Sequence, residues 1–260
     1  MLSGRIPKIF FVLLAICVFL AGAFLASRRK PAPVYPTIRI TVPEGYTVAR
    51  VDELLSEKKV IAPGALLGFD SSSLDKEYCF LEKGDGLEGF LFPDTYEFFL
   101  GSSAKVVTEK FLDNFNRRAA GLVCGKEVPG EIVTMASLIE KEIPDFESDR
   151  NIVSGILWKR MEFGMPLQVD ASLCFASNPL GCGDSGIDLK MDSLYNTYLY
   201  YGLPPGPIAN PGLSAIIAAL NPEESPYWYY ISDPKTKKTV FSKSLDEHNR
   251  NIVKYLKGNS

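Results

Sequence analysis

The amino-acid sequence predicts an α+β protein with a transmembrane helix at its N-terminus. Three observations lead to this prediction. Residues 9–26 form an unbroken apolar run, residues 37–42 alternate apolar and polar side chains as a strand does, and several later segments repeat apolar residues at helical spacing. The expected organisation is a membrane anchor over residues 1–30, a linker and small subdomain over residues 31–85, and a larger mixed domain over residues 86–260.

The composition excludes several classes of function. The net charge is −3, and the charged residues are mixed along the chain with no basic patch, so we expect no nucleic-acid partner. The single histidine, His248, excludes a metal site built from several histidines. We therefore expect no metal and no other cofactor.

The apolar run at residues 9–26 has the length of a membrane segment. At about 1.5 Å per residue it nearly spans a bilayer core of about 30 Å. The alternative is a cleavable signal peptide, with Ala21-Gly22-Ala23 as the cleavage site. We favour an uncleaved anchor, because the run is longer than an ordinary signal core and Arg28-Arg29-Lys30 follow it directly.

A proline-rich spacer at residues 31–36 leads into the small subdomain. The strand predicted at residues 37–42 is followed by Thr47, which can cap a helix with one apolar side. A second short helix is predicted after Pro63. This β-α-α unit shows no obvious chemistry, so a packing or spacing module is the better interpretation.

Residues 86–99 interleave aromatic residues with Glu88, Asp94 and Glu97. One interpretation is a strand pair joined at Pro93-Asp94, with the acids in solvent. The other is the wall of a groove, since aromatic faces beside carboxylates suit sugar rings. A helix is expected to follow over residues 104–118, where apolar residues recur at helical spacing.

Residues 131–142 predict a buried helix that carries a candidate acid. Glu140 falls on the same apolar stripe as Val133 and Ala136, at spacings of seven and four residues. Such a carboxylate must be paired or have its pKa raised by lost hydration, and a raised pKa suits a general acid. The alternative is a helix-end glutamate that forms a salt bridge with Lys141 or an arginine.

A helix that begins near Ser148 and ends at Gly164 is expected next. Gln168 and Asp170 follow it and lie on the same side if that stretch is extended, so both could point into one cleft. The alternative for Asp170 is that it caps a short helix over residues 171–175.

The last part of the chain alternates a rigid loop with short regular elements. Prolines stiffen residues 202–212, and Asn210 is expected to cap a helix over residues 213–220. A hairpin is predicted from residues 227–231 and 239–241. Ser244 with Glu247 forms a capping box for the last helix, where we interpret His248 as structural.

Several motifs occur in an order that resembles one family. The chain is similar to the endolytic murein transglycosylases of the MltG (YceG-like) family from about Thr37 to the C-terminus. The motifs are Leu87-Glu-Gly-Phe-Leu-Phe-Pro-Asp-Thr-Tyr96, Ala136-Ser-Leu-Ile-Glu-Lys-Glu142, Leu167-Gln-Val-Asp170, Tyr195-Asn-Thr-Tyr198, Gly202-Leu-Pro-Pro-Gly-Pro-Ile-Ala-Asn-Pro-Gly212 and Glu247-His-Asn249.

This resemblance implies a single-pass protein of the cell inner membrane with its catalytic domain in the periplasm and a LysM-like subdomain at the β-α-α unit. It implies internal cleavage of nascent peptidoglycan strands between N-acetylmuramic acid and N-acetylglucosamine, with 1,6-anhydro ends as products, and partnership with peptidoglycan, membrane lipid and peptidoglycan synthases. Glu140, the last residue of the Ala-Ser-x-x-Glu motif, is the expected catalytic acid. The residues expected to hold sugar are Gln168, Asp170, Tyr195, Asn196, Thr197 and Asn210.

Two alternatives to this function stay open. A muramidase would use water, with Glu140 as the acid and Asp170 or Asp94 as the second carboxylate. A membrane-anchored scaffold would bind peptidoglycan without cleaving it. A scaffold does not need a glutamate on a buried apolar stripe, and that feature argues against it.

The cysteines predict two disulfides. Cys17 lies in the apolar run, and the other four of the five cysteines lie in a domain expected outside the cytoplasm. Four cysteines allow three pairings. We favour Cys174 with Cys182, because a short loop can bring them together, which leaves Cys79 with Cys124. The alternative is four buried, reduced thiols.

Overall fold

The computed structural model describes residues 36–72, 74–81, 86–126, 128–143, 147–181 and 187–257, together with Ile16 and Phe19. Two units divide the chain, Met1–Pro36 and Thr37–Ser260. The membrane anchor predicted at residues 9–26 therefore lies almost entirely outside the described residues. None of the helices formed by described residues combines the length and apolar character that crossing a bilayer requires.

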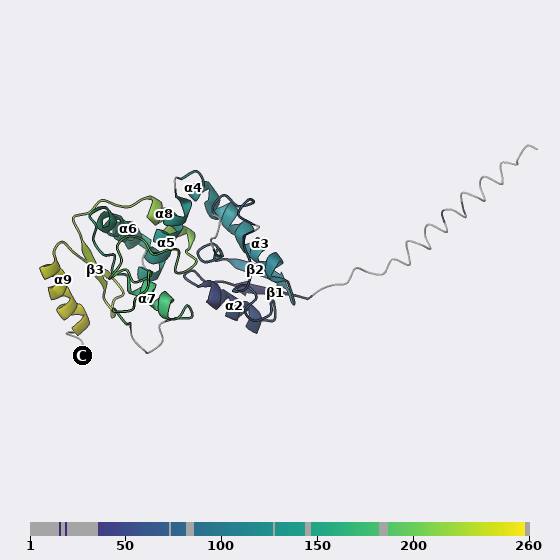
Figure 1. Cartoon of the computed structure of the whole chain (residues 1–260), viewed down its shortest axis with the longest axis horizontal. Coiled ribbons are helices and arrows are strands. Elements are labelled where there is room, and N and C mark those ends of the chain that lie inside the picture. Colours follow the sequence, from purple (N-terminus) through teal and green to yellow (C-terminus); the bar gives the residue numbers. More distant parts are fainter. Residues whose placement is uncertain are drawn as a thin grey trace, which may run out of the picture. The chain divides into compact units, whose positions relative to one another are not determined.

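The unit Thr37–Ser260 is mixed α+β, as the sequence predicts (Figure 1). Its strands form two separate antiparallel pairs, β1 with β2 and β3 with β4. Its elements are β1 (Thr37–Thr41), α2 (Val48–Glu57), β2 (Thr95–Phe99), α3 (Ala104–Phe115), the π-helix η1 (Asn116–Ala120), α4 (Gly121–Val123), α5 (Pro129–Glu142), α6 (Glu147–Glu162), α7 (Asp170–Ser177), α8 (Leu213–Leu220), β3 (Tyr229–Ser232), β4 (Thr239–Ser242), α9 (Leu245–Ile252) and the π-helix η3 (Val253–Lys257).

The first sheet pairs segments that are far apart in the chain. Thr37 lies opposite Phe99 and Thr41 opposite Thr95, so the sheet crosses the boundary expected between residues 85 and 86. The strand pair that is one interpretation of residues 86–99 does not form, because Thr95–Phe99 is the strand of this stretch and its partner is β1. Two short strands and one helix bury little apolar surface alone. These elements therefore share one apolar cluster with α3. Its members include Ile40, Val51, Leu55, Phe98, Val107 and Phe111.

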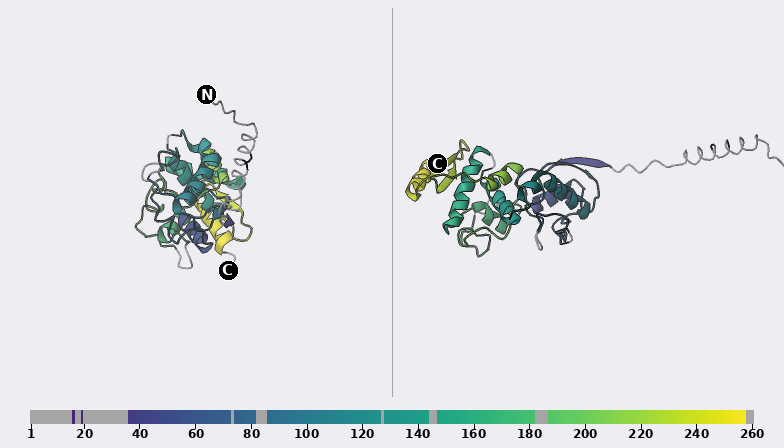
Figure 2. Two further views of the ribbon diagram at one scale, coloured as in Figure 1. Left: turned by 90° about the vertical axis from the view of Figure 1, so that its right-hand side faces the viewer. Right: turned by 90° about the horizontal axis from the view of Figure 1, so that it is seen from above.

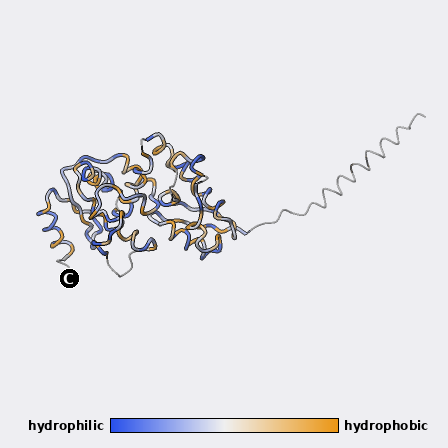
Figure 3. The backbone as a smooth tube through the Cα atoms, viewed as in Figure 1, coloured by the Kyte–Doolittle hydropathy of each residue, from blue (hydrophilic) through white to orange (hydrophobic). Residues whose placement is uncertain are grey.

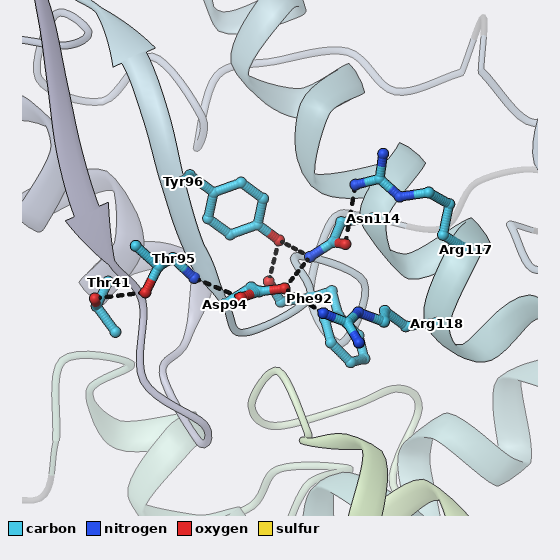
Figure 4. A network of polar contacts seen from close by, with 8 residues as sticks. All are labelled: Thr41, Phe92, Asp94, Thr95, Tyr96, Asn114, Arg117 and Arg118. Atoms are coloured by element: carbon cyan, nitrogen blue, oxygen red, sulfur yellow. Dashed lines mark hydrogen bonds and ion pairs between the residues drawn. The ribbon is translucent and has the colours of Figure 1, made fainter.

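A polar network joins β2 to the helix that follows it (Figure 4). Asp94 accepts hydrogen bonds from the Thr95 N–H at 2.7 Å, from Asn114 Nδ2 at 3.0 Å and from Arg118 Nη2 at 3.2 Å. These donors, the Asn114 amide first, hold the pKa of Asp94 below its usual value. Asp94 is therefore an ionised residue of the fold and not a proton donor.

Helix α5 is the centre of the helical half of this unit. It contacts α8, α6 and α7, and it ends at Glu142 as predicted, where the Ile143 N–H bonds to the Ile139 carbonyl. Apolar and polar stretches are mixed through the whole of this unit (Figure 3). Gly155 allows α6 to approach the segment after α8, since a Cβ there would lie 2.0 Å from the Glu223 carbonyl oxygen.

The C-terminal hairpin and helix form as predicted. Tyr229 pairs with Ser242 in β3 and β4, and α9 packs against both strands. Ser244 Oγ accepts from the Glu247 N–H at 3.3 Å, while Glu247 Oε2 accepts from the Lys243 N–H at 2.7 Å. This group lies at the end of the unit opposite β1 (Figures 1 and 2).

The predicted pairing of Cys79 with Cys124 is confirmed. Their Cα atoms lie 5.8 Å apart, and the bond joins residues separated by 45 positions. The bond joins the segment before β2 to the end of α4. The residues beside each cysteine, among them Phe80 and Val123, belong to a second and larger apolar cluster. Cys174 is also disulfide-bonded. Its predicted partner, Cys182, lies outside the described residues.

Replacing Cys79 and Cys124 by serine should lower the free energy of unfolding by about 2–4 kcal/mol, because the unfolded chain gains the freedom of an open loop. Chemical denaturation without reductant measures this loss. The control is the same variant with reductant, which isolates the contribution of Cys174. A variant as stable as the unreduced parent would contradict a stabilising disulfide.

Candidate active site

Glu140 is buried, with 4% of its surface exposed, and both of its carboxylate oxygens are occupied. Arg150 Nη2 donates to Oε1 at 2.9 Å, and the Gly212 N–H donates to Oε2 at 3.0 Å. Arg150 Nε also donates to the Ile143 carbonyl at 2.9 Å. A single buried ion pair thus joins the end of α5, the start of α6 and the loop before α8.

The surroundings of Glu140 act on its pKa in opposite directions. Burial is the largest effect and holds the pKa of Glu140 above its usual value, while the positive charge of Arg150 and the hydrogen bond from Gly212 partly oppose this. Glu44 approaches the same arginine at 4.0 Å, and a Cβ on Gly212 would lie 2.0 Å from Glu44 Oε1. The alternative predicted from the sequence for Glu140 is a salt bridge with Lys141 or an arginine, and the arginine is Arg150. The expected catalytic role of Glu140 stays a prediction.

Glu142, two residues further along, lines a cavity of about 550 Å³, which we call the Glu142 cavity. This volume is typical of small-molecule sites. Its walls come from α5, α6, the segment before α7, β3 and α9. The other lining residues are Arg160, Gln168, Asp170, Tyr198, Tyr229, Tyr230, Ile231, Ser232, Leu245, His248, Asn249, Ile252 and Leu256.

The pKa of Glu142 is raised to about 7, and the largest cause is burial. The negative charge of Asp170 raises it further, whereas a hydrogen bond with the Tyr230 side chain and the positive charge of Arg160 lower it. A carboxyl with this pKa keeps its proton over part of the neutral range and can release it to a substrate. Glu142 therefore has the properties that the sequence analysis assigned to Glu140.

Gln168 and Asp170 both line the Glu142 cavity, as the alternation of this stretch suggested. Tyr198 donates a hydrogen bond from its hydroxyl to Asp170 Oδ1 at 2.5 Å. Gln168 has a φ of 55°, which is uncommon for a residue other than glycine and recurs at functional sites. Its N–H donates to the Thr197 carbonyl at 3.1 Å, which helps to hold this conformation.

Arg160 and His248 were missed by the sequence analysis as residues of a site. Arg160 donates from Nη1 to the Leu167 carbonyl at 2.8 Å and lies 5.2 Å from the centre of the Tyr229 ring. The His248 ring stacks on the Tyr229 ring, with the two ring centres 5.1 Å apart. Burial first, and then the charge of Arg160, lowers the pKa of His248, so the imidazole is neutral at pH 7. The motif Glu247-His-Asn249 was the sequence signal for this wall.

Asn196, Thr197 and Asn210 use their side chains inside the fold. Asn196 Nδ2 donates to the Met191 carbonyl at 2.8 Å, and Thr197 Oγ1 accepts from the Val169 N–H at 2.9 Å. Asn210 Oδ1 accepts from the Leu91 N–H at 2.8 Å. All three are at most 1% exposed, so direct contact between them and sugar stays a prediction. Asn210 also does not cap α8, because the capping position is Gly212.

Tyr195 lies elsewhere, in a cavity of about 720 Å³ that we call the Glu88 cavity. Burial raises the pKa of Glu88 to about 8, and the hydrogen bond from the Val48 N–H, 3.0 Å from Oε2, opposes this. The predicted sugar-holding residues are therefore divided among two cavities and the protein interior.

Comparisons with known proteins agree on one family. The model of the YceG-like family matches residues 23–254. The endolytic murein transglycosylase of Streptococcus pneumoniae is 29% identical over 252 residues, covering 86% of this chain and 45% of that protein. The protein of the same name from Bacillus subtilis is 35% identical over 175 residues, covering 65% of this chain and 48% of that protein. This chain thus spans about half the length of these curated relatives.

A solved structure is similar as well. The crystal structure of a yceG-like protein from Listeria monocytogenes superimposes with a TM-score of 0.68 at 30% sequence identity. The similarity covers 88% of this chain and 80% of that one. It therefore extends over most of the unit that holds both cavities.

The raised pKa of Glu142 predicts a pH-dependent stability. The folded chain binds this proton more tightly than the unfolded chain. The protonated carboxyl therefore contributes fully to the stability of the fold below pH about 4.5, and this contribution is lost as pH rises through about 7. As the pH rises from about 5 to about 8, the free energy of unfolding of the wild type should fall by up to about 3 kcal/mol relative to that of Glu142→Gln. Thermal unfolding at several pH values measures this difference. Asp94→Asn is the control. Because the pKa of Asp94 is lowered, its charge does not change over this pH range, and neither should its contribution to stability. A stability difference between wild type and Glu142→Gln that stays constant with pH would contradict the raised pKa of Glu142.

Proposed function

Because this chain belongs to the YceG-like family, we propose that it is a peptidoglycan lytic transglycosylase. It would cleave nascent glycan strands internally, between N-acetylmuramic acid and N-acetylglucosamine, and leave 1,6-anhydro ends. The observation that carries this proposal is Glu142, a buried carboxyl with a pKa of about 7 that faces a cavity of ligand size. The curated relatives bear this activity in their names.

The mechanism needs one carboxyl. Glu142 gives its proton to the glycosidic oxygen, the bond from that oxygen to the sugar carbon breaks, and positive charge develops on the ring. The 6-hydroxyl of the same sugar attacks this carbon and passes its proton to the Glu142 carboxylate, which restores the starting acid. The tethered hydroxyl competes well with water because it is already in place.

The structural surroundings favour Glu142 over Glu140 as the acid. A general acid must hold a proton and reach the substrate. Burial raises the pKa of Glu140 as well, but both of its oxygens accept hydrogen bonds, from Arg150 and from the Gly212 N–H, so they are poorly placed to reach a substrate. We therefore move the expected catalytic role from Glu140 to Glu142. Glu140 serves instead to fix the end of α5.

A muramidase is the second candidate, and one observation favours it. Asp170 lines the Glu142 cavity, so a second carboxylate is available to activate water. Asp170 already accepts a hydrogen bond from Tyr198, and its charge raises the pKa of Glu142. In the transglycosylase these effects keep Glu142 protonated, which is why we prefer that function.

We also propose that residues 9–26 anchor the chain in the inner membrane, with the catalytic unit in the periplasm. The apolar run supports the anchor, and the bond between Cys79 and Cys124 supports an oxidising compartment. The order β1, α2, β2 supports a LysM-like subdomain, and peptidoglycan synthases are the partners this placement suggests. Release of the chain from membranes by alkaline carbonate without detergent would count against the anchor.

Glu142→Gln should lower the rate of glycan cleavage by about 10²–10⁴-fold, because glutamine cannot transfer the proton. Glu140→Gln removes the nearer of the two carboxylates beside Arg150, with Glu44 remaining at 4.0 Å, and should lower stability by up to about 3–5 kcal/mol, yet the folded variant should still cleave. Digestion of purified glycan strands, well below the unfolding temperature of each variant, measures both rates. An active Glu142→Gln beside a folded, inactive Glu140→Gln would return the acid role to Glu140.

The chemical nature of the new ends separates the remaining functions. The transglycosylase should yield 1,6-anhydro-muramoyl ends within strands, free of label when digestion is run in isotopically heavy water. A muramidase would yield reducing ends that carry the label, and a scaffold would yield no new ends. Mass analysis of the digest distinguishes the three. Labelled reducing ends as the main product would replace the proposed reaction by hydrolysis.

A further inference from the structure

The Glu88 cavity has no part in the mechanism above. It lies at the opposite end of α5 from Glu142, where Gly130, Glu131 and Thr134 line it. Its remaining wall is mainly aromatic and proline side chains with a glycine backbone. These residues are Gly86, Glu88, Phe90, Val128, Met161, Tyr195, Gly202, Leu203, Pro204, Pro205, Gly206 and Pro207.

The same three elements line both cavities. Helix α5 contributes Thr134 to the Glu88 cavity and Glu142 to the other, and α6 contributes Met161 and Arg160 in the same way. The loop after α7 contributes Tyr195 to the Glu88 cavity, and Tyr198, three residues later, to the Glu142 cavity. At about 1.5 Å per residue the lining positions on α5 span about 12 Å. The two cavities are therefore neighbours along one helix.

The wall of the Glu88 cavity is shaped by a close backbone contact. Gly89 has a φ of 91°, and a Cβ at that position would lie 2.5 Å from Pro207 Cγ. Any larger residue would push the proline loop away from the segment that carries Glu88. The contact therefore holds Glu88 and the proline loop together as two sides of one hollow.

The chemistry of this hollow suits a neutral, polar ligand. Burial keeps Glu88 protonated at neutral pH, so it can donate a hydrogen bond as well as accept one. Tyr195 supplies a hydroxyl that lies 3.6 Å from the position a Cβ on Gly206 would take. No lysine or arginine is among the described residues that line the cavity, which argues against a phosphate or carboxylate ligand. Phe90 and the prolines offer apolar surface for the faces of a sugar ring.

The loop that carries residues of both cavities is exposed and apolar. Leu199 is 52% exposed and Tyr201 is 69% exposed, and both lie between Tyr198 and Gly202 in the sequence. Large apolar side chains gathered on a surface mark interaction sites.

We propose that the Glu88 cavity binds an N-acetylated amino sugar of the same glycan strand whose bond is cleaved in the Glu142 cavity. This inference rests on the proposed function. Glu88 and the Tyr195 hydroxyl bind the acetamido and hydroxyl groups, and the apolar wall packs against the ring. A strand must then be long enough to reach from one cavity to the other to bind fully, which favours cleavage within strands.

The test uses the full chain carrying Glu142→Gln, so that binding is measured without cleavage. The probes are N-acetylglucosamine oligomers, a disaccharide and an octasaccharide, titrated by calorimetry. Adding Tyr195→Phe removes one hydroxyl and should weaken octasaccharide binding about 2–10-fold. A disaccharide can occupy either cavity by itself, so its affinity should fall by no more than the same factor. Tyr227→Phe, which lines neither cavity, is the matched control and should change neither affinity.

Gly206→Ala is the second variant. Its methyl group makes an ordinary contact with the Tyr195 hydroxyl and covers it, so octasaccharide binding should again fall. Octasaccharide affinity unchanged by Tyr195→Phe would overturn the proposal. Weaker octasaccharide binding by Tyr195→Phe, in a chain whose parent leaves glycan strands uncut, would support the sugar site while refuting the transglycosylase reaction, so the two failures are distinguishable.

Discussion

The buried ion pair between Glu140 and Arg150 is the interaction on which the rest of the site depends. Arg150 binds both the carboxylate and the Ile143 carbonyl, and Gly212 binds the other oxygen, so three segments meet at the end of α5. Two buried charges cost much hydration, and removal of one takes the nearest opposite charge from the other. The pair therefore requires α5, α6 and the loop before α8 to keep one arrangement. Glu142 lies in the last turn that this arrangement fixes.

Two glutamates at the same helix end have different surroundings. Burial raises the pKa of both. The charge of Arg150 opposes this rise at Glu140, whereas the charge of Asp170 adds to it at Glu142. In the proposed enzyme the first glutamate holds the backbone and the second transfers the proton.

The Glu142 cavity is assembled late in the chain. Its outer wall comes from β3 and α9, and Arg160 holds that wall to the helices by donating to the Trp228 and Leu167 carbonyls. Thr197, in the loop after α7, holds that loop to the segment before α7. Its carbonyl accepts from the Gln168 N–H, and its hydroxyl accepts from the Val169 N–H. Residues predicted to touch sugar therefore serve in part to place those that line the cavity.

The sequence by itself determined the local structure and the family. The bounds of α8, the cap at Thr47, the end of α5 at Glu142 and the hairpin all follow from short-range patterns. The bond between Cys79 and Cys124 follows from the small number of cysteines. Only the tertiary structure decided which glutamate faces a cavity. An apolar stripe marks Glu140 as unusual, but Arg150, Asp170 and Tyr230, which set the two environments, reach α5 from other elements. The pairing of β1 with β2 and the burial of Asn210 were decided in the same way, because hydration and charge at a residue depend on neighbours distant in the sequence.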